Sequence, residues 1–289
     1  MDSFHPLASE YRVSVIIPTH NRLSRLPVAV DSVLEQTYSA HELIVVDDGS
    51  TDGTAQWLAR ERPSVTVIRQ DNKGVSHARN RGIEAASGNW IALLDSDDRW
   101  YAHKLATQIN ALRNQPGHRL CHSDEHWLRN GKRVNPKYKH QKYGGSIFAH
   151  CLPLCAISPS AALIEKSLIE DIGLFDESLP ACEDYDLWLR ISARENVLFV
   201  DEALLEKTGG HDDQLSQRFP AMDRFRLQAL AKLIRSGILS PSQLTLALST
   251  FSDKLTIFIN GAKKRGKHDS ARQLLEQFDD VVLKINQTI

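Results

Sequence analysis

The sequence predicts an α/β fold: a mainly parallel central sheet flanked by helices, with a C-terminal helical appendage. Two observations support this fold class. Short apolar, β-branched runs alternate with helical patterns through the first hundred residues, as in a parallel sheet whose strands are buried on both faces. Beyond residue 220 the apolar spacing is helical throughout.

Four strands are expected in the first hundred residues, with helices between them. The expected strands are Val13–Ile17, Leu43–Asp47, Val65–Arg69 and Trp90–Leu94. This alternation implies parallel strands joined by right-handed crossovers.

The segments between these strands show the periodicity and the end signals of helices. Apolar faces run through Leu23–Leu34 and Val75–Ala86. Thr51 to Thr54 offer N-cap chemistry for a helix in between. We expect Gly88 to close the last of these helices as its C-cap.

The later half begins with a hairpin signal. Asn130-Gly131 predicts a type I′ turn between strands at Arg119–Leu128 and Arg133–Asn135. Strands at Ala161–Glu165 and Val197–Asp201 and a helix through Glu183–Arg194 follow.

From Pro220 onward we expect three helices, broken near Gly237 and near Gly261–Gly266. The sequence therefore predicts a domain over residues 11–215, with a first half 11–100 and a second half 101–215. A helical appendage covers residues 220–289.

Composition excludes several classes of protein. The chain of 289 residues carries a net charge of about −1, so no global field attracts it to DNA, and we expect no DNA partner. No apolar run approaches the roughly 20 residues of a membrane span, and the first 12 residues lack a signal-peptide core. The four cysteines lack a paired framework and are typical of reduced thiols. A cytoplasmic protein is predicted, with peripheral association at the inner face of the membrane left open.

Polar and acidic residues follow each of the first four strands. They are Pro18–Arg22, Asp47–Ser50, Gln70–Gly74 and Asp95–Asp98. In open parallel sheets ligands bind beyond the carboxyl ends of the strands, so these four loops predict a binding site. Neither Gly-x-Gly-x-x-Gly nor a P-loop follows the first strand, which disfavours a dinucleotide fold and a P-loop nucleotidase.

Three carboxylates lie within four residues at the end of a buried strand, in Asp95-Ser96-Asp97-Asp98. Such charges repel and are hard to desolvate, so a bound cation is the first candidate to offset them. If the segment is extended, Asp95 and Asp97 point to the same side and together could hold a divalent metal. The alternative is that they cap the helix that follows.

Two further acidic positions have both a functional and a structural interpretation. Asp48 could accept a hydrogen bond from a base or a ribose, or it could serve turn chemistry in Asp-Asp-Gly-Ser. Glu183-Asp184 opens a helix, where carboxylates are favoured electrostatically. A carboxylate there could instead act as the general base for an attacking hydroxyl.

Two more features remain open. His211 follows two glycines and could be a ligand, although most lone histidines are structural or exposed. The run 129–143 contains six Lys or Arg and no acid, and it is either a solvated loop or a grip for phosphates on an acceptor.

Five motifs together resemble the inverting family-2 glycosyltransferases with the GT-A fold. They are VSVIIPTHNR at Val13–Arg22, VDDGSTDGT at Val46–Thr54, Asn72–Gly74 with Ala78–Gly82, LDSDD at Leu94–Asp98, and EDYDLW at Glu183–Trp188. The order and the spacing of the motifs match this family. The resemblance covers residues 11 to about 215.

The resemblance implies roles for the matching positions. Asp184 would be the catalytic base, with Glu183 and Trp188 at the acceptor. The nucleotide would contact Pro18, Thr19, His20, Arg22, Asp47, Asp48, Lys73, Arg79 (or its neighbour Asn80), Asp95 and Ser96. Mn²⁺ or Mg²⁺ would be held by Asp97, Asp95 and His211.

The implied reaction is a single displacement at the anomeric carbon of a nucleotide-diphosphate sugar, with a UDP-sugar expected. The acceptor would be a glycan, a lipid-linked saccharide or another anionic molecule in bacterial surface glycan assembly. The Gln-x-x-Arg-Trp motif of processive synthases is absent from the sequence, so we expect transfer of one sugar.

Other readings stay open at this point. A nucleotidyltransferase would need a Gly-rich, basic loop after the first strand, and Pro18–Arg22 does not supply one. A non-catalytic nucleotide-sugar-binding or interaction module on the same fold is an alternative, because a fold does not fix a function. Transfer to a protein or RNA acceptor and a homodimer are also open.

Overall fold

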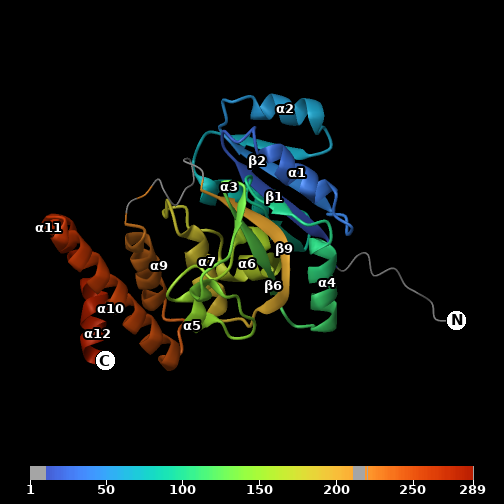
Figure 1. Cartoon of the computed structure of the whole chain (residues 1–289). Helices are drawn as coiled ribbons and strands as arrows, with labels where there is room; N and C mark the ends of the chain where they lie inside the picture. The colour runs from blue at the N-terminus through green and yellow to red at the C-terminus, as the bar shows by residue number, and fades with distance from the viewer. Residues whose placement is uncertain (1–10, 211–218, 220, 289) are drawn as a thin grey trace. The chain divides into compact units, whose positions relative to one another are not determined.

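The computed structural model describes residues 11–210, 219 and 221–288. The chain forms two compact units, and each is described by itself (Figure 1). The first unit comprises the described residues of 1–145, 157–180 and 196–211. The second comprises those of 146–156, 181–195 and 212–289. Two short segments of the predicted main domain thus pack with the C-terminal helices.

The first unit is built on one mixed sheet of nine strands. In chain order, its strands and helices are β1 (Val13–Thr19), α1 (Leu26–Leu34), β2 (Glu42–Asp48), α2 (Thr54–Glu61), β3 (Thr66–Gln70), α3 (Val75–Ala85), β4 (Trp90–Leu93), β5 (Arg99–Trp100), α4 (Lys104–Asn114), β6 (Leu120–Arg129), β7 (Lys132–Val134), η2 (Tyr138–His140), η3 (Pro159–Ala161), β8 (Leu163–Glu165), α6 (Lys166–Ile172) and β9 (Leu198–Gly209).

The strand order is β3-β2-β1-β4-β8-β6-β9-β5, and β7 pairs with β6. The strands β3, β2, β1 and β4 are parallel neighbours, as the alternating sequence pattern predicts. Parallel β1, β2 and β4 place their carboxyl ends at one edge of the sheet, where the sequence predicts the binding site.

The core follows from the alternation of side chains along β1. Val13, Val15 and Ile17 are fully buried in one hydrophobic cluster with residues of α1 and α4. Helix α3 packs on β1 and β2, where Gly82 faces Ile16. Since both faces of β1 are covered, the strand is a continuous apolar run rather than an alternating one.

The structure confirms the hairpin turn that Asn130-Gly131 predicts between β6 and β7. Asn130 and Gly131 have φ angles of 52° and 73°, and a type I′ turn needs positive φ at both central residues.

The expected C-cap at Gly88 is wrong. Helix α3 ends at Ala85, and its C-cap residue Ala86 is extended. A Cβ on Gly88 would lie 2.3 Å from the carbonyl oxygen of Arg12 and 2.6 Å from Ser14 Oγ. Glycine is therefore needed at this position for close approach to the chain entering β1, not for a left-handed cap.

The second unit is helical. Its elements are α5 (Phe148–Cys151), α7 (Glu183–Ser192), α9 (Asp223–Arg235), α10 (Pro241–Lys264), α11 (His268–Gln277) and α12 (Asp279–Thr288). A capping box of Ser240 and Gln243 starts α10, and this helix continues through Gly261 before the chain turns at Gly266. The break between α10 and α11, at residues 265–267, lies where the sequence predicts it, near Gly261–Gly266. A further break at Phe278 separates α11 from α12, so the described residues beyond 220 form four helices rather than the three expected. No helix among the described residues is long and apolar enough to cross a membrane.

Candidate functional site

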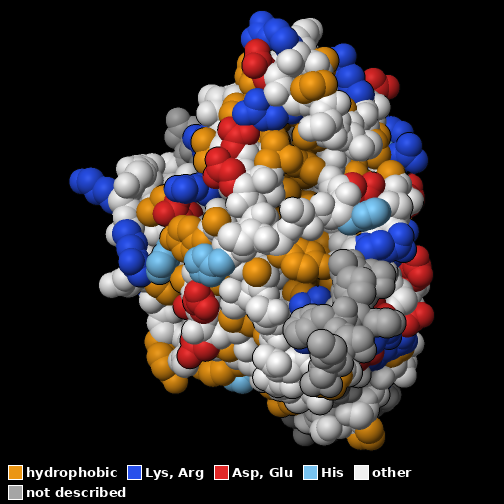
Figure 2. All heavy atoms as spheres, turned by 90° about the vertical axis from the view of Figure 1, so that its right-hand side faces the viewer, with side chains coloured by type: hydrophobic (Ala, Val, Ile, Leu, Met, Phe, Trp, Pro, Cys, Tyr) orange, Lys and Arg blue, Asp and Glu red, His pale blue; other side chains and the backbone are white. Residues whose placement is uncertain are grey.

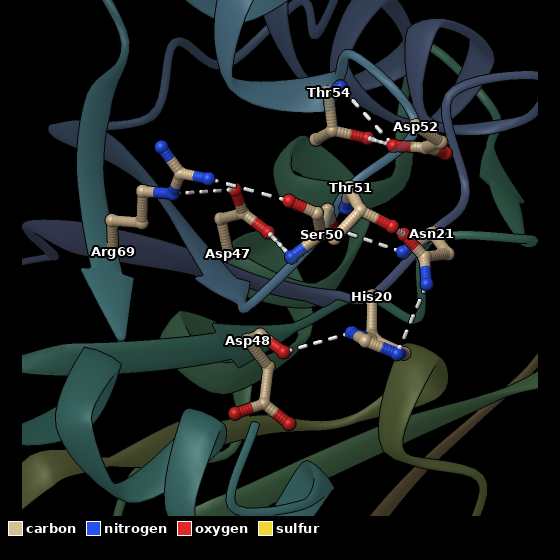
Figure 3. Close-up of polar contacts among 9 residues, drawn as sticks. All are labelled: His20, Asn21, Asp47, Asp48, Ser50, Thr51, Asp52, Thr54 and Arg69. Atoms are coloured by element: carbon tan, nitrogen blue, oxygen red, sulfur yellow. Dashed lines mark hydrogen bonds and ion pairs between the residues drawn. The ribbon is translucent and has the colours of Figure 1, made fainter. Parts of the chain in front are cut away.

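The first corner of the site lies where β1 and β2 end (Figure 3). Asp47, fully buried, accepts a hydrogen bond from the amide of Ser50 at 2.9 Å, and Arg69 Nε lies 3.6 Å from its second oxygen. The turn chemistry of Asp-Asp-Gly-Ser therefore falls to Asp47, and the side chain of Asp48 is directed elsewhere.

Asp48 organises the loop before α3. Its carboxylate accepts hydrogen bonds from the amides of Lys73 and Gly74, both at 2.8 Å, and from Gln70 Nε2 at 2.7 Å. Only 4% of Asp48 is exposed. Two backbone donors to one buried carboxylate fix the loop against β2, and the exposed side chain of Lys73 extends from it.

His20 is held in one orientation next to Asp48. Its Nδ1 lies 2.8 Å from the carbonyl oxygen of Asp48, and Asn72 Nδ2 lies 3.0 Å from its Nε2. A carbonyl can only accept, so Nδ1 donates and Nε2 accepts from the amide of Asn72. Figure 3 shows this ring between the loops after β1 and β2.

The last residues of β1, next to His20 in the chain, are buried. Pro18 pairs in register with Val46, and Thr19 with Asp47. The hydroxyl of Thr19 is buried and has no hydrogen-bond partner among the described residues. A buried hydroxyl without a partner is costly, so it is a candidate contact for a ligand group at this edge.

The acidic segment after β4 is a turn, and the expectation of an extended segment is wrong. The amide of Asp98 donates to the carbonyl oxygen of Asp95 at 3.0 Å, which places Ser96 and Asp97 at the central positions of a β-turn. Ser96 is 8% exposed. Asp95 and Asp97 are thus positioned by turn geometry rather than by strand alternation.

Each of these two carboxylates faces an arginine from another element. Arg79 Nη2, on α3, lies 2.7 Å from Asp95 Oδ1, and Arg22 Nη1 lies 3.5 Å from Asp97 Oδ2. Arg79 is buried, and its guanidinium faces the ring of Phe175 at 5.2 Å. These arginines offset much of the repulsion within the turn.

The neighbour Asn80 has a structural role. Its amide group donates to the carbonyl oxygen of Phe175 and to Glu177, and its oxygen accepts from the Phe175 amide. All three bonds fix the loop after α6, so Arg79 is the better candidate for contact with a donor.

Asp98 is buried and unlike the other two acids of the turn. It accepts from Ser160 Oγ at 2.6 Å and from the Thr208 amide at 2.8 Å. Burial and the nearby charges of Asp97 and Asp95 raise the pKa of Asp98 well above its usual range.

The turn fits a hard divalent cation whose coordination is completed by oxygen atoms of a substrate. Carboxylate oxygens suit Mg²⁺ and Mn²⁺, and Mg²⁺ is commonly bound by one or two carboxylates together with substrate phosphates. Asp95 and Asp97 are partly exposed and supply such a pair. Within the described residues, no group of three or more His, Cys, Asp or Glu could hold a metal alone. His211, the third predicted ligand, lies outside the described residues.

Asp184 belongs to the second unit, at the start of α7. Cys155 Sγ lies 3.2 Å from Asp184 Oδ2, and the amide of Tyr185 lies 2.7 Å from Oδ1. Asp184 is partly exposed, whereas Glu183 is 4% exposed. Asp184 lies in the first turn of α7, and a partly exposed carboxylate is a group that can serve as a general base.

Two other residues of this motif are buried within the second unit. Asp186 is 1% exposed and pairs with Arg190 at 2.9 Å and with Lys232 at 3.1 Å. Trp188 is also 1% exposed. Contact of Glu183 and Trp188 with an acceptor stays a prediction.

The Lys and Arg residues of the basic run 129–143 differ in their surroundings. Lys142 turns inward, and its Nζ lies 3.3 Å from Glu125 Oε1. Despite burial, Lys142 and Lys207 lower the pKa of Glu125 to about 2. The other five Lys and Arg residues of the run are exposed. Lys142 therefore anchors this segment to β6, and a grip on acceptor phosphates could only come from the remaining cations.

Sequence reasoning missed the partners that position several of these residues. They are Ser160 and Thr208 at Asp98 and, within the second unit, Cys155 at Asp184. Gln70 and Asn72 lie in a loop that the sequence predicts at the site, but their contacts with Asp48 and His20 were not predicted. The third acid of LDSDD was visible as an excess charge, but its partners lie 62 and 110 residues away in the sequence.

Residues 14–173 match the model of glycosyl transferase family 2. The chain belongs to this family. The uncharacterised glycosyltransferase RT0329 of Rickettsia typhi is 35% identical over 210 residues, which is 70% of this chain and 65% of that protein. The chain spans between about a third and two thirds of the length of the Rickettsia relatives that it matches.

Two Escherichia coli relatives have more specific names. WfgD, named a UDP-Glc:α-D-GlcNAc-diphosphoundecaprenol β-1,3-glucosyltransferase, is 32% identical over 195 residues, which is 66% of this chain and 74% of WfgD. WfaP has the same activity name and is 30% identical over 189 residues, which is 63% of this chain and 70% of WfaP.

Solved structures confirm the GT-A fold that the family-2 motifs predict. TarS residues 1–349 of S. aureus, in complex with UDP-GlcNAc, has a TM-score of 0.75 at 21% identity, over 96% of this chain and 84% of that one. The mannosyltransferase PcManGT of Pyrobaculum calidifontis, with GDP-Man and Mn²⁺, has a TM-score of 0.61 at 21% identity, over 94% and 81% of the two chains.

Proposed function

We propose that this protein transfers one sugar from a UDP-sugar to a hydroxyl of a lipid-linked saccharide diphosphate, with inversion at the anomeric carbon. The observation that carries the proposal is the sheet edge after β1, β2 and β4. There Asp48 and His20 are fixed by hydrogen bonds, and Asp95 and Asp97 form a turn beside two arginines.

The nucleoside would bind over the first corner. His20 and the loop that Asp48 orders form a polar surface there, and the buried hydroxyl of Thr19 has an open hydrogen bond. Exposed Lys73 and partly buried Arg22 would offset phosphate charge. A UDP-sugar is favoured because WfgD and WfaP, at about 30% identity, are named for UDP-Glc.

The turn after β4 would hold the diphosphate. Asp97 and Asp95 would bind Mn²⁺ or Mg²⁺, which would stabilise the charge on the departing nucleoside diphosphate. Arg79 keeps Asp95 oriented, and Arg22 can exchange Asp97 for a phosphate oxygen. His211 remains a proposed additional ligand.

Asp184 would act as the general base. Its carboxylate would take the proton from the acceptor hydroxyl as this attacks the anomeric carbon, while the thiol of Cys155 orients its second oxygen. Glu183 and Trp188 stay proposed contacts of the acceptor. The acceptor class rests on the names of WfgD and WfaP, which act on GlcNAc-diphosphoundecaprenol.

A transfer assay tests the proposal. Purified protein is incubated with Mn²⁺, a panel of nucleotide sugars and a synthetic GlcNAc-diphosphate lipid, and the acceptor is analysed by mass spectrometry. The expected product carries one added hexose from UDP-Glc, and Asp184→Asn gives none. Binding of a nucleotide sugar without transfer to any hydroxyl acceptor would instead support the non-catalytic module.

A further inference from the structure

Asp98 has no part in the proposed chemistry, yet it is the most deeply buried acid of the turn. It is 3% exposed, and both of its oxygens are engaged by the protein. Oδ2 accepts from Ser160 Oγ at 2.6 Å, and Oδ1 accepts from the amide of Thr208 at 2.8 Å. No substrate is needed to satisfy this carboxylate.

Ser160 connects Asp98 to the other end of the same turn. While its hydroxyl donates to Asp98, its oxygen accepts from the amide of Asp95 at 3.0 Å. The carbonyl oxygen of Ser160 accepts from Trp100 Nε1 at 2.8 Å, and the residue is fully buried. One fixed hydroxyl thus holds the first and the last residue of the four-residue turn.

Thr208 connects Asp98 to a second element. It lies near the end of β9, the strand that pairs with β5 directly after the turn, through Trp100 and Leu205. The Asp98 side chain therefore joins the turn after β4 to the last residues of β9. The adjacent Lys207 is bound to Ser158 Oγ at 2.9 Å, so this end of β9 is also anchored by its side chain.

We propose that Asp98 is a positioning residue for the donor site, which sets the geometry at which Asp95 and Asp97 meet the cation and the diphosphate. The inference rests on the proposed function, because it assigns Asp98 a role toward that donor. Asp98 acts on the backbone of the turn, through Ser160 and the amide of Asp95, and so on the direction of the two carboxylates. Loss of a residue that orients metal ligands typically weakens metal binding about 10- to 100-fold.

Three variants separate the links. Asp98→Ala removes both acceptors and leaves the Thr208 amide and the Ser160 hydroxyl without a partner. Asp98→Asn keeps one acceptor oxygen and the shape, so it should restore part of what Asp98→Ala loses. Ser160→Ala cuts the link to Asp95 while Asp98 keeps its bond to Thr208.

Ser14→Ala is a matched control at the opposite end of the same sheet. Ser14 is fully buried and donates to Glu42 Oε1 at 2.6 Å. Loss of the Ser14 hydroxyl should lower the free energy of unfolding in a similar way and leave the geometry at the carboxyl ends of the strands unchanged.

The experiment is calorimetric titration with UDP, with and without Mn²⁺, on the wild type and the four variants, alongside urea unfolding. We expect Mn²⁺-dependent UDP affinity to fall about tenfold or more in Asp98→Ala and less in Asp98→Asn. Ser160→Ala should also weaken it, while Ser14→Ala should bind as the wild type does. Metal-independent UDP binding should change little, which a general loss of structure would not produce.

Wild-type affinity for UDP with Mn²⁺ in folded Asp98→Ala or Asp98→Asn would overturn the inference, and so would equal weakening by Ser14→Ala. Absence of Mn²⁺-dependent binding of UDP, GDP, CDP and dTDP by the wild type would refute the donor site itself. The failure of the inference and the failure of the donor site are distinguishable, because only the latter is seen in the wild-type protein.

Discussion

Arg79 Nη2 lies 2.7 Å from Asp95 Oδ1, and this ion pair joins helix α3 to the acidic turn after β4. Only 4% of the Arg79 side chain is exposed, so neither solvent nor salt screens the pair well. The three acids of the turn thus have three different supports: Arg79 for Asp95, Arg22 for Asp97, and Ser160 with Thr208 for Asp98.

Arg79→Ala should be strongly destabilising. Removing one partner of a buried ion pair leaves the other charge uncompensated and costs about 3–5 kcal/mol. Because Asp95 is 28% exposed, we expect the lower end of this range. Urea unfolding measures the loss in free energy of unfolding. Arg60→Ala is the control, because Arg60 is 79% exposed beside Glu61 and should contribute under about 1 kcal/mol. Similar losses for the two variants would contradict the assignment.

Asp48→Ala should loosen the loop before α3. The amides of Lys73 and Gly74 lose their acceptor, and a hydrogen bond to a buried charged group contributes about 1.5–3 kcal/mol. Amide hydrogen exchange at these two positions should accelerate, and nucleotide affinity should fall. Asp52→Ala, which removes an exposed cap of Thr54, should leave both exchange rates unchanged. Unaltered exchange in Asp48→Ala would contradict the role.

Asp184 and Asp186 lie two residues apart, and their substitution should affect different properties of the protein. Asp184→Asn should lower the transfer rate about 10²- to 10⁴-fold, the usual contribution of a general base, with donor affinity and stability retained. Asp186→Asn should instead lower stability, because Asp186 is buried between Arg190 and Lys232. Transfer rate, calorimetry and urea unfolding on both variants check this. Normal turnover in Asp184→Asn would exclude it as the base.

Lys104 should make stability depend on pH. Burial lowers the pKa of Lys104 to about 7, and Trp100 lies under its Nζ at 4.1 Å. Between about pH 7 and pH 10.4 the unfolded chain binds more protons than the folded one. The free energy of unfolding should therefore rise with pH in this window, by at most about 1.4 kcal/mol per pH unit.

Lys104→Met should remove that rise. Urea unfolding of the wild type and the variant across this window isolates the effect, because the other titrating groups cancel in the difference. A difference that does not change with pH would show that Lys104 keeps its proton in the folded state.

The parallel half of the sheet was predictable because its signals are local. The strands ending at Thr19 and Asp48 are apolar runs, and Asn130-Gly131 encodes its own turn. Strand β9 extends to Gly209, well beyond the predicted end, because exposed acids at Asp201 and Glu202 hide its pattern. Propensity does not show which strand such a segment will pair with.

The site was predictable in composition but not in geometry. The acids of the turn are visible in the sequence, yet strand alternation assigned Asp95 and Asp97 the wrong backbone conformation. Gly88 carries a cap signal, but the contact that requires glycine comes from Arg12, 76 positions earlier. The partners of Asp98 and Asp48 are likewise remote or are backbone amides, which no residue pattern marks.

The measurement that tests the central claim most directly is titration of UDP-glucose into the wild type and Asp97→Ala, with Mn²⁺ and with EDTA. Because Asp97 is 19% exposed and lies 3.5 Å from Arg22, urea unfolding accompanies the titration and establishes that Asp97→Ala is folded. We predict Mn²⁺-dependent binding by the wild type that EDTA abolishes and that Asp97→Ala lacks. Equal binding by folded Asp97→Ala, or no binding of UDP-glucose or any other nucleotide sugar by the wild type, would contradict the donor site at the carboxyl ends of β1, β2 and β4.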